Sequence, residues 1–350
     1  MKRIHTLFLI LALTITFACT TFAAERQVPP GLLRAAMVAQ GNHTPHLLAN
    51  PDVVGTAVGI ERGVPVVKVL VKRLGVTGIP RFLDGFRTVP FVTGKIVALG
   101  KPGGVDRTAR YRPAPIGVST GHPSITAGTI GCRVKDQAGK VYVLSNNHVY
   151  ADENGAKIGD NVLQPGPYDG GKDPVDSIGT LSDFEEISFE TLPGEGDCNY
   201  IDAAIALSSP DLVDNTTPTD GYGVPESTTF EAVDDSIGMA VMKYGRTTGL
   251  TKGKIDSINA TVRVSYDQGV AIFCDQIIIT PGKFSAGGDS GSLIVMNDVT
   301  VVGKGKNATI NPGPDHLKPV GLLFAGSSVV TIANRIQNVL DAFGVTIDGK

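Results

Sequence analysis

The segment Phe284–Val295 reads Phe-Ser-Ala-Gly-Gly-Asp-Ser-Gly-Ser-Leu-Ile-Val. The glycines on both sides of Ser290 allow a tight turn and a close approach of the backbone to a ligand. The apolar run Leu293–Val295 that follows is typical of a buried strand. A serine hydroxyl becomes a good nucleophile only when a base accepts its proton, and the oxyanion that it then produces needs donors already in place. We therefore expect Ser290 to act with partners from elsewhere in the chain.

His148 is the best candidate for the base among the six histidines of the chain. It follows the β-type run Val141–Leu144 and a short polar stretch, which places it where a strand ends. Asp202 lies in the apolar segment Tyr200–Leu207, and burying a carboxylate without a partner costs several kcal/mol or forces it to take up a proton. We expect His148 to be that partner, with Asp202 fixing the tautomer of the imidazole ring.

The fragments that carry these three residues are Ser145–Val149, Asp202–Ala206 and Gly288–Ser292. In content and chain order they resemble those of the chymotrypsin-like (trypsin-fold) serine peptidases, and the Asn-Asn-His form resembles exported bacterial members. The resemblance implies a mainly β fold, with a double antiparallel β-barrel and a C-terminal helix. It also implies a Ser-His-Asp triad that hydrolyses peptide bonds through an acyl-enzyme. An α/β-hydrolase is disfavoured because its histidine follows the serine and its motif is Gly-x-Ser-x-Gly, whereas residue 292 is serine here.

The resemblance implies roles for other residues of the nucleophile loop. The backbone amides of Gly288 and Ser290 would form the oxyanion hole, in which each donor contributes about 3 kcal/mol of transition-state stabilisation. Asp289 would hold this loop, often through a buried charge. No cofactor is required by such a mechanism, and no histidine or cysteine spacing indicates a metal site.

The resemblance also indicates where substrate would bind. Phe284 would lie at the base of the pocket for the side chain before the scissile bond, where an acid would favour Lys or Arg. The segment Phe324, Ala325 and Gly326 belongs to the strand that would pair with substrate backbone, and Phe324 would line the same pocket. We expect a protein or peptide substrate. Two alternatives stay open: a non-catalytic protein-binding module on this scaffold, and an esterase that uses the same triad.

The beginning of the chain indicates export. Lys2 and Arg3 precede Leu7–Ala18, an apolar stretch of 12 residues, and small residues up to Ala24 offer a cleavage point. This stretch is too short to span a bilayer, so residues 1–24 are a predicted signal peptide and the mature protein is periplasmic or secreted, without a membrane anchor. Lipidation at Cys19 is a weaker alternative. Cleavage changes the formal charge from −3 to −5, which argues against a nucleic-acid partner.

The mature chain would keep three cysteines: Cys132, Cys198 and Cys274. An odd number in an oxidising compartment allows at most one intramolecular disulfide and leaves a thiol over. The favoured interpretation is that all three are small buried hydrophobic residues.

The predicted organisation has four parts: the signal peptide, a small α+β accessory or pro-domain at 25–98, a linker at 99–115, and the peptidase domain at 116–350. The N-terminal domain has a helix-like run from Leu32 to Gln40 and three strand-like runs at 53–60, 64–72 and 91–98. Arginines and prolines mark the linker as an exposed connector. Near the C-terminus, helical spacing of apolar residues predicts a helix that Gly344 stops; these residues are Ile332, Ile336, Leu340 and Phe343.

Three weaker motifs have structural interpretations. Gly245–Gly249 is expected to be a turn. Asp152–Asn154 with Asp160 is expected to be a solvated turn, with calcium binding the less favoured alternative. Two further histidines, His43 and His46, lie in a segment that reads as a loop without a nearby nucleophile.

Overall fold

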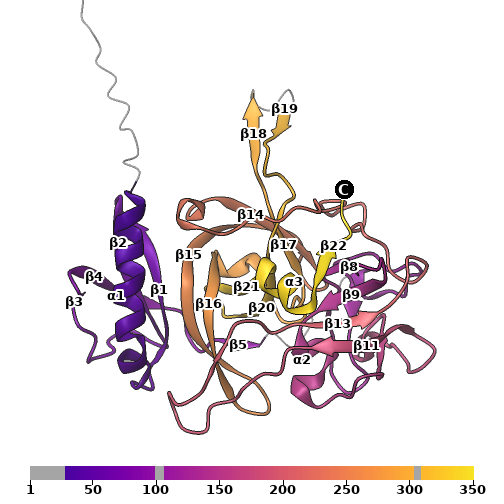
Figure 1. Cartoon of the computed structure of the whole chain (residues 1–350), viewed down its shortest axis with the longest axis horizontal. Coiled ribbons are helices and arrows are strands. Elements are labelled where there is room, and N and C mark those ends of the chain that lie inside the picture. Colours follow the sequence, from indigo (N-terminus) through magenta and orange to yellow (C-terminus); the bar gives the residue numbers. More distant parts are fainter. Residues whose placement is uncertain (1–27, 99–105, 303–308) are drawn as a thin grey trace, which may run out of the picture.

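A computed structural model describes residues 28–98, 106–302 and 309–350 (Figure 1). The expected signal peptide and the first part of the expected linker lie outside these ranges. The described chain is mainly β, as the sequence predicts. The small N-terminal part stands at one side of the molecule in Figure 1, and the two β-sheets of the remaining chain lie next to each other.

The N-terminal part combines one helix with strands. Its elements are α1 (Pro30–Leu48), β1 (Val53–Glu61), β2 (Val64–Val71), β3 (Phe82–Leu83) and β4 (Phe86–Val92). The helix is longer than the predicted run to Gln40, because the buried residues Thr44, Leu47 and Leu48 continue its packing face. The Gln40 side chain donates to Thr56 of β1 over 2.7 Å. His43 and His46 both lie within α1, so the prediction that they belong to a loop is wrong.

The last predicted strand of this part, at 91–98, is wrong in its bounds. The chain forms β4 up to Val92, and β4 pairs in parallel with β2. A separate short strand, β5 (Val97–Ala98), leaves this part and pairs with strands of the second barrel. Thr93, Gly94 and Lys95 interrupt the apolar residues between the two strands, and the predicted run wrongly continues across this interruption.

The first barrel is an antiparallel sheet with the order β10-β11-β13-β9-β8-β22. Its strands are β8 (Cys132–Asp136), β9 (Val141–Ser145), β10 (Asn161–Leu163), β11 (Ser177–Phe184), β13 (Ala204–Leu207) and β22 (Val345–Ile347). The short pair β6 (Ser119–Thr120) and β7 (Gly128–Thr129) lies beside it, and α2 (Asn147–Tyr150) follows β9. The C-terminal strand β22 pairs with β8, so the end of the chain returns to the first barrel.

The second barrel closes through six antiparallel strands. They are β14 (Ala240–Gly245), β15 (Gly249–Ser265), β16 (Val270–Thr280), β17 (Leu293–Met296), β20 (Pro319–Gly326) and β21 (Thr331–Arg335). The ring of pairings runs β14-β15-β16-β21-β20-β17 and returns to β14. The short β12 (Cys198–Asn199) extends it, and β18 (Val299–Val302) with β19 (Thr309–Pro312) forms a hairpin that projects from the body (Figure 1).

The N-terminal part and the second barrel share one sheet. Strand β1 pairs antiparallel with β15, with Gly55 opposite Val262 and Thr56 opposite Thr261. A side chain on Gly55 would have no room, because a Cβ there would lie 2.4 Å from the carbonyl oxygen of Thr261. The N-terminal part therefore docks on the barrel by backbone pairing at close range.

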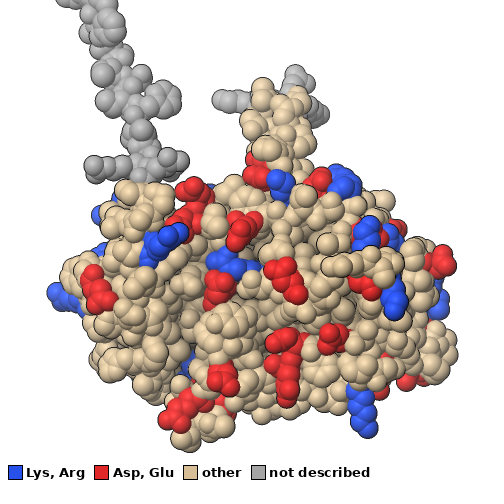
Figure 2. Space-filling model, in the orientation of Figure 1, with Lys and Arg blue, Asp and Glu red and all other residues tan. Residues whose placement is uncertain are grey.

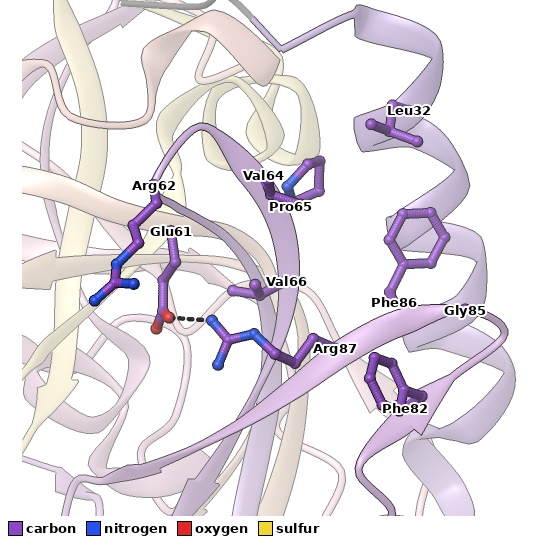
Figure 3. Close-up of a pocket in the computed structure, with 10 residues that line it drawn as sticks. All are labelled: Leu32, Glu61, Arg62, Val64, Pro65, Val66, Phe82, Gly85, Phe86 and Arg87. Atoms are coloured by element: carbon purple, nitrogen blue, oxygen red, sulfur yellow. Dashed lines mark hydrogen bonds and ion pairs between the residues drawn. The ribbon is translucent and has the colours of Figure 1, made fainter.

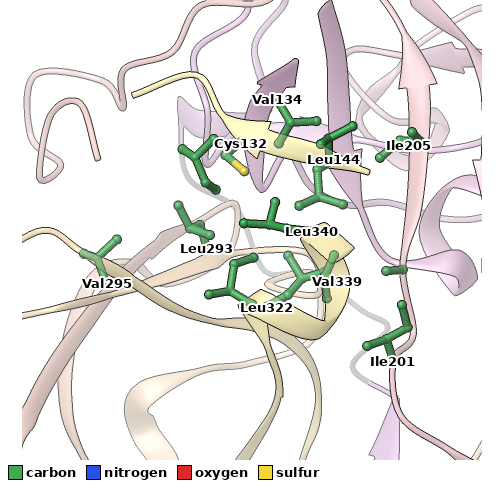
Figure 4. Packing of buried hydrophobic residues seen from close by; sticks show 14 of the residues in the cluster. Cys132, Val134, Leu144, Ile201, Ile205, Leu293, Val295, Leu322, Val339 and Leu340 are labelled. Carbon is green, nitrogen blue, oxygen red and sulfur yellow. The ribbon is translucent and has the colours of Figure 1, made fainter. Parts of the chain in front are cut away.

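A hydrophobic cluster joins the two barrels to the C-terminal helix (Figure 4). Cys132 and Leu144 from the first barrel and Leu322 from the second are all buried in it, together with Leu340 of α3 (Ile336–Phe343). Gly344 ends this helix in the left-handed conformation, with φ 61°. The predicted helix is thus confirmed from Ile336 onward.

The prediction that this helix reaches back to residue 332 is wrong. Ile332 lies in β21, where it pairs with Ile278 of β16. Residue 332 pairs within the closed barrel, although its spacing from the next apolar residues fits a helix.

The second half of the expected linker is not an exposed connector. Arg110 pairs with Asp176 at 2.7 Å, and Ala114 is fully buried in the core of the first barrel. Arg112 donates to the carbonyl and the side chain of Gln164. Residues 106–115 therefore belong structurally to the first barrel, and their basic side chains have partners there.

The cysteines differ in part from the expectation. Cys132 is a free, buried thiol, as expected, and burial raises its pKa. Cys198 and Cys274 instead form a disulfide, with Cα atoms 5.7 Å apart, which is within the usual range for such a bond. Parallel pairing of β12 with β16 brings these two residues together across 76 positions of sequence.

Candidate active site

His148 lies in the single-turn helix α2 at the end of β9, as the sequence predicts. Two neighbouring asparagines hold this helix. Asn146 donates its side-chain amide to the carbonyl of Asp202 over 2.7 Å, and Asn147 donates to the carbonyl of Glu185 over 2.6 Å. The two asparagines of the Asn-Asn-His sequence thus hold the backbone segment that carries the His148 side chain.

The structure brings His148 and Asp202 together. His148 Nδ1 lies 2.6 Å from Asp202 Oδ2, and the His148 backbone amide donates to Asp202 Oδ1 over 3.2 Å. Asp202 is fully buried and the His148 side chain is 10% exposed. The backbone amide of Asp202 donates to Asn334 Oδ1 over 3.0 Å, which ties the pair to the second barrel. A carboxylate held in this way fixes Nδ1 as the protonated ring nitrogen and leaves Nε2 as the acceptor.

Ser290 lies in the loop before β17, and the loop turns at Gly288 and Gly291, which have φ angles of 91° and 93°. Its carbonyl accepts from the Thr129 amide over 2.7 Å. A Cβ on Gly128 would lie 3.0 Å from the Ser290 carbonyl and 2.5 Å from a methyl group of Val149, the residue after His148. The serine loop and the histidine helix are therefore neighbours across the two barrels.

Both the serine and the second nitrogen of the imidazole are covered. Ser290 is fully buried. His148 Nε2 is buried as well, and no hydrogen-bond partner for it lies among residues 28–98, 106–302 and 309–350. A buried acceptor nitrogen without a hydrogen-bond partner lowers the stability of the fold. A general base, however, needs such a nitrogen free to accept a proton from the reacting group.

A buried ion pair holds the serine loop, as the family resemblance implies for Asp289. Lys243 Nζ lies 3.2 Å from Asp289 Oδ2, and neither side chain is exposed. Burial lowers the pKa of Lys243, and the charge of Asp289 opposes this shift. The amides of Thr247 and Thr248 donate to Asp289 Oδ1 over 2.9 and 3.1 Å. The predicted turn Gly245–Gly249 is confirmed, and it acts as the cradle of this carboxylate.

The two phenylalanines expected in the substrate pocket lie in separate buried clusters. Phe284 packs in the core of the second barrel, with Lys243 Nζ 5.8 Å from its ring centre. Phe324 packs against Phe273, with ring centroids 4.7 Å apart. The structure therefore does not bring Phe284 and Phe324 to one open surface, and their roles in specificity stay predictions.

The backbone of the expected substrate-binding strand is occupied. Ala325 and Gly326 of β20 pair antiparallel with Ala98 and Val97 of β5. This segment of the N-terminal part lies where the resemblance places the backbone of a peptide substrate.

A cavity of about 630 Å³ lies in the N-terminal part and not at the His148–Asp202 pair (Figure 3). It is bounded by Phe82 and Phe86 on one side and by the β1–β2 turn on the other, and Glu61 and Arg87 form an ion pair at its edge. Arg62 and several apolar side chains also line it, and no serine, cysteine or histidine does.

Sequence reasoning missed Tyr266 and Asn334, which both contact Asp202. The hydroxyl of Tyr266 donates to Asp202 Oδ2 over 2.8 Å. Tyr266 lies at the turn between β15 and β16, and only the Asp-Gln-Gly sequence after it signals that turn.

Other features of the described residues bear on partners. No cluster of three or more His, Cys, Asp or Glu side chains suited to a metal ion occurs in the described part of the chain. No helix within the described ranges is long and apolar enough to cross a membrane. Acidic and basic side chains are interspersed on the face shown in Figure 2, without a continuous basic area.

Comparisons with known proteins give one family model and several solved structures. A model described as the Nal1 C-terminal domain matches residues 223–330. No curated protein matches the chain.

Solved serine proteases are similar in structure. A glutamic acid specific serine protease is 20% identical, covers 67% of this chain and 99% of its own, and gives a TM-score of 0.44. Protease A of Thermobifida fusca is 18% identical, with 68% and 100% covered and a TM-score of 0.43. The Nocardiopsis protease is 16% identical, with 67% and 99% covered and a TM-score of 0.41. By its fold, this chain is similar to bacterial chymotrypsin-like serine proteases.

Proposed function

We propose that this protein is an exported serine endopeptidase in which Ser290, His148 and Asp202 form a catalytic triad. The observation that carries the proposal is the buried Asp202 carboxylate 2.6 Å from His148 Nδ1, beside the glycine-flanked serine loop. A buried histidine–carboxylate pair that leaves Nε2 unpaired is arranged for proton transfer and not for stability. Export rests on the sequence of residues 1–24.

In the proposed reaction, His148 accepts a proton and then donates it in each of two steps, acylation and deacylation. Ser290 Oγ attacks the carbonyl carbon of the scissile bond while His148 Nε2 takes the hydroxyl proton. The amides of Gly288 and Ser290 stabilise the oxyanion. The tetrahedral intermediate then expels the amine, which receives the proton from His148, and an acyl-serine remains. Water, deprotonated by His148, attacks the ester, and His148 then gives this proton to Ser290 Oγ as the acid leaves. Asp202 stays ionised throughout and supports the imidazolium.

A labelling experiment separates this proposal from its two alternatives. A fluorophosphonate probe should label the exported full-length protein, with the adduct on the peptide that contains Ser290, and a peptide library should be cleaved. Absence of labelling favours the binding module. Labelling and ester hydrolysis without any peptide cleavage favour the esterase. Because the family resemblance assigns Phe284 to the position where an acid would favour basic side chains, we expect cleavage after residues other than Lys and Arg.

The N-terminal part, residues 25–98, is proposed to restrain or assist the peptidase domain. Strand β5 occupies the backbone of β20 at Ala325–Gly326. Strand β1 extends the second barrel through β15. The first contact would compete with a peptide substrate, and the second would support the long β15–β16 hairpin during folding.

Removing the N-terminal part tests this role. A protein that begins at Asp106 keeps residues 106–115, which pack in the first barrel. If β5 restrains the cleft, this protein should react with the fluorophosphonate faster than the full-length chain, about tenfold if the cleft is open in a tenth of the full-length molecules. If the N-terminal part assists folding, the shortened protein should fold only when residues 25–105 are supplied as a separate chain. Unaided folding with unchanged rate constants contradicts both roles.

A further inference from the structure

Tyr266 contacts both members of the His148–Asp202 pair. Its hydroxyl donates to Asp202 Oδ2 over 2.8 Å, and the same oxygen lies 2.6 Å from His148 Nδ1. Its ring meets the imidazole edge to face, with centroids 6.0 Å apart and an interplanar angle of 61°. One carboxylate oxygen therefore interacts with the donors of two side chains.

The turn that carries Tyr266 is fixed to the helix segment that carries His148. The Tyr266 amide donates to the Gly269 carbonyl over 2.8 Å and closes the β15–β16 turn. The Glu153 carboxylate accepts from the amides of Asp267 and Gln268 over 3.2 and 2.9 Å. Glu153 lies in the short turn Asp152–Asn154, which is separated from α2 by Ala151, so this turn also holds the hairpin.

The surroundings keep the phenol in its neutral, donating form. The titratable groups that face it are Asp202, His148 and Glu153, and the rings of Phe189 and Phe273 pack at its sides. Burial raises the pKa of Tyr266 well above its usual value, and the negative charge of Asp202 adds to the shift. The hydroxyl is therefore protonated at every pH at which a histidine titrates.

We propose that Tyr266 is a positioning residue that acts on His148 through Asp202, by orienting the carboxylate and by sharing its negative charge. Charge-assisted hydrogen bonds are strong, and two donors on one oxygen divide its charge between them. Without the hydroxyl, Asp202 Oδ2 would hold only the imidazole and would bind its protonated form more tightly. The inference rests on the proposed function insofar as His148 is the catalytic base.

The variant Tyr266→Phe tests this inference because it removes the hydroxyl and keeps the ring. We expect kcat/KM for peptide cleavage to fall about tenfold near pH 7, with most of the loss in kcat. We expect the acid limb of the rate profile to move to higher pH, by roughly half a unit, because the protonated imidazole is favoured. Rates are normalised to active sites titrated with a fluorophosphonate, so a smaller folded fraction does not imitate either effect.

The matched control is Tyr142→Phe, which removes a different tyrosine–aspartate hydrogen bond, 3.2 Å long, between Tyr142 and Asp136 on the first barrel. It should leave the acid limb in place. A second readout, the NMR titration of the His148 ring, does not depend on hydrolysis and should show a higher midpoint in Tyr266→Phe alone. An unchanged NMR midpoint together with an unchanged acid limb overturns the inference. A shifted NMR midpoint in a protein that cleaves nothing supports the role of Tyr266 and rejects the proposed function.

Discussion

Replacing Ser290 by alanine should lower kcat/KM for peptide cleavage by about 10⁴-fold or more, the loss typical of a triad member, while the fold stays intact. In the proposed mechanism this hydroxyl forms the acyl-enzyme, so its removal leaves the reaction without its nucleophile. The backbone contacts of the loop do not depend on it, since Thr129 binds the Ser290 carbonyl and Gly291 donates its amide to Leu323. Steady-state kinetics on full-length protein, with circular dichroism to confirm folding, measures the effect.

A matched control for this variant is Ser285→Ala. Ser285 lies in the same loop, and its hydroxyl forms a buried hydrogen bond of 2.6 Å with Thr331. Losing that bond should lower the free energy of unfolding by about 1 kcal/mol without abolishing turnover. If Ser290→Ala keeps more than a few per cent of wild-type turnover, or if Ser285→Ala loses as much as Ser290→Ala, Ser290 is not the nucleophile.

The parts of the site that could be predicted from the sequence are those with a local signature. A glycine-flanked serine before an apolar run, and a histidine after a β-type run, each mark a side chain at the end of a strand. Asp202 stands out because an acid in an apolar segment needs a partner, and the structure provides His148 at 2.6 Å. The order of the histidine, aspartate and serine fragments along the chain then indicates the family, which no single fragment does.

Tyr266 could not be found in this way because its contact is a long-range one. It lies 64 positions from Asp202 in the sequence, and only the closure of the second barrel through β15 and β16 brings the two together. The sequence shows that Tyr266 precedes a turn, but it does not show which group the Tyr266 side chain contacts. The disulfide between Cys198 and Cys274 depends on barrel pairing in the same way.

Tertiary packing also explains where the predicted boundaries fail. Helix α1 continues through Pro45, because Thr44 bonds to the carbonyl of Gln40 and to Thr56 of β1 and the next turn is buried. Ile332 fits a helical pattern yet lies in β21, because the pairing of β21 with β16 is part of the closed barrel. In both places a weak local preference gives way to burial in a larger structure.

Replacing Asp202 by asparagine should also lower kcat/KM by about 10⁴-fold, although the two side chains have nearly the same shape. Asp202 Oδ2 accepts from Tyr266 and faces His148 Nδ1, and Oδ1 accepts from the His148 backbone amide. Both oxygens of the Asp202 carboxylate therefore face hydrogen-bond donors and must act as acceptors. An asparagine must place its NH₂ group against one of these donors, and if that group faces Nδ1, the ring proton moves to Nε2, which then accepts nothing from Ser290.

Kinetics and NMR of the imidazole together check this prediction for Asp202→Asn. The ring of His148 should carry its proton on Nε2 in the neutral form, and labelling of Ser290 by a fluorophosphonate should slow in parallel with peptide cleavage. The matched control is Asp160→Asn, which alters another histidine–aspartate pair, His122 Nε2 to Asp160 Oδ2 at 3.2 Å, in which the carboxylate is partly exposed. That control should retain most of the activity. A fully active Asp202→Asn would mean that the buried carboxylate only stabilises the fold, and the catalytic base would then have to work without an orienting acid.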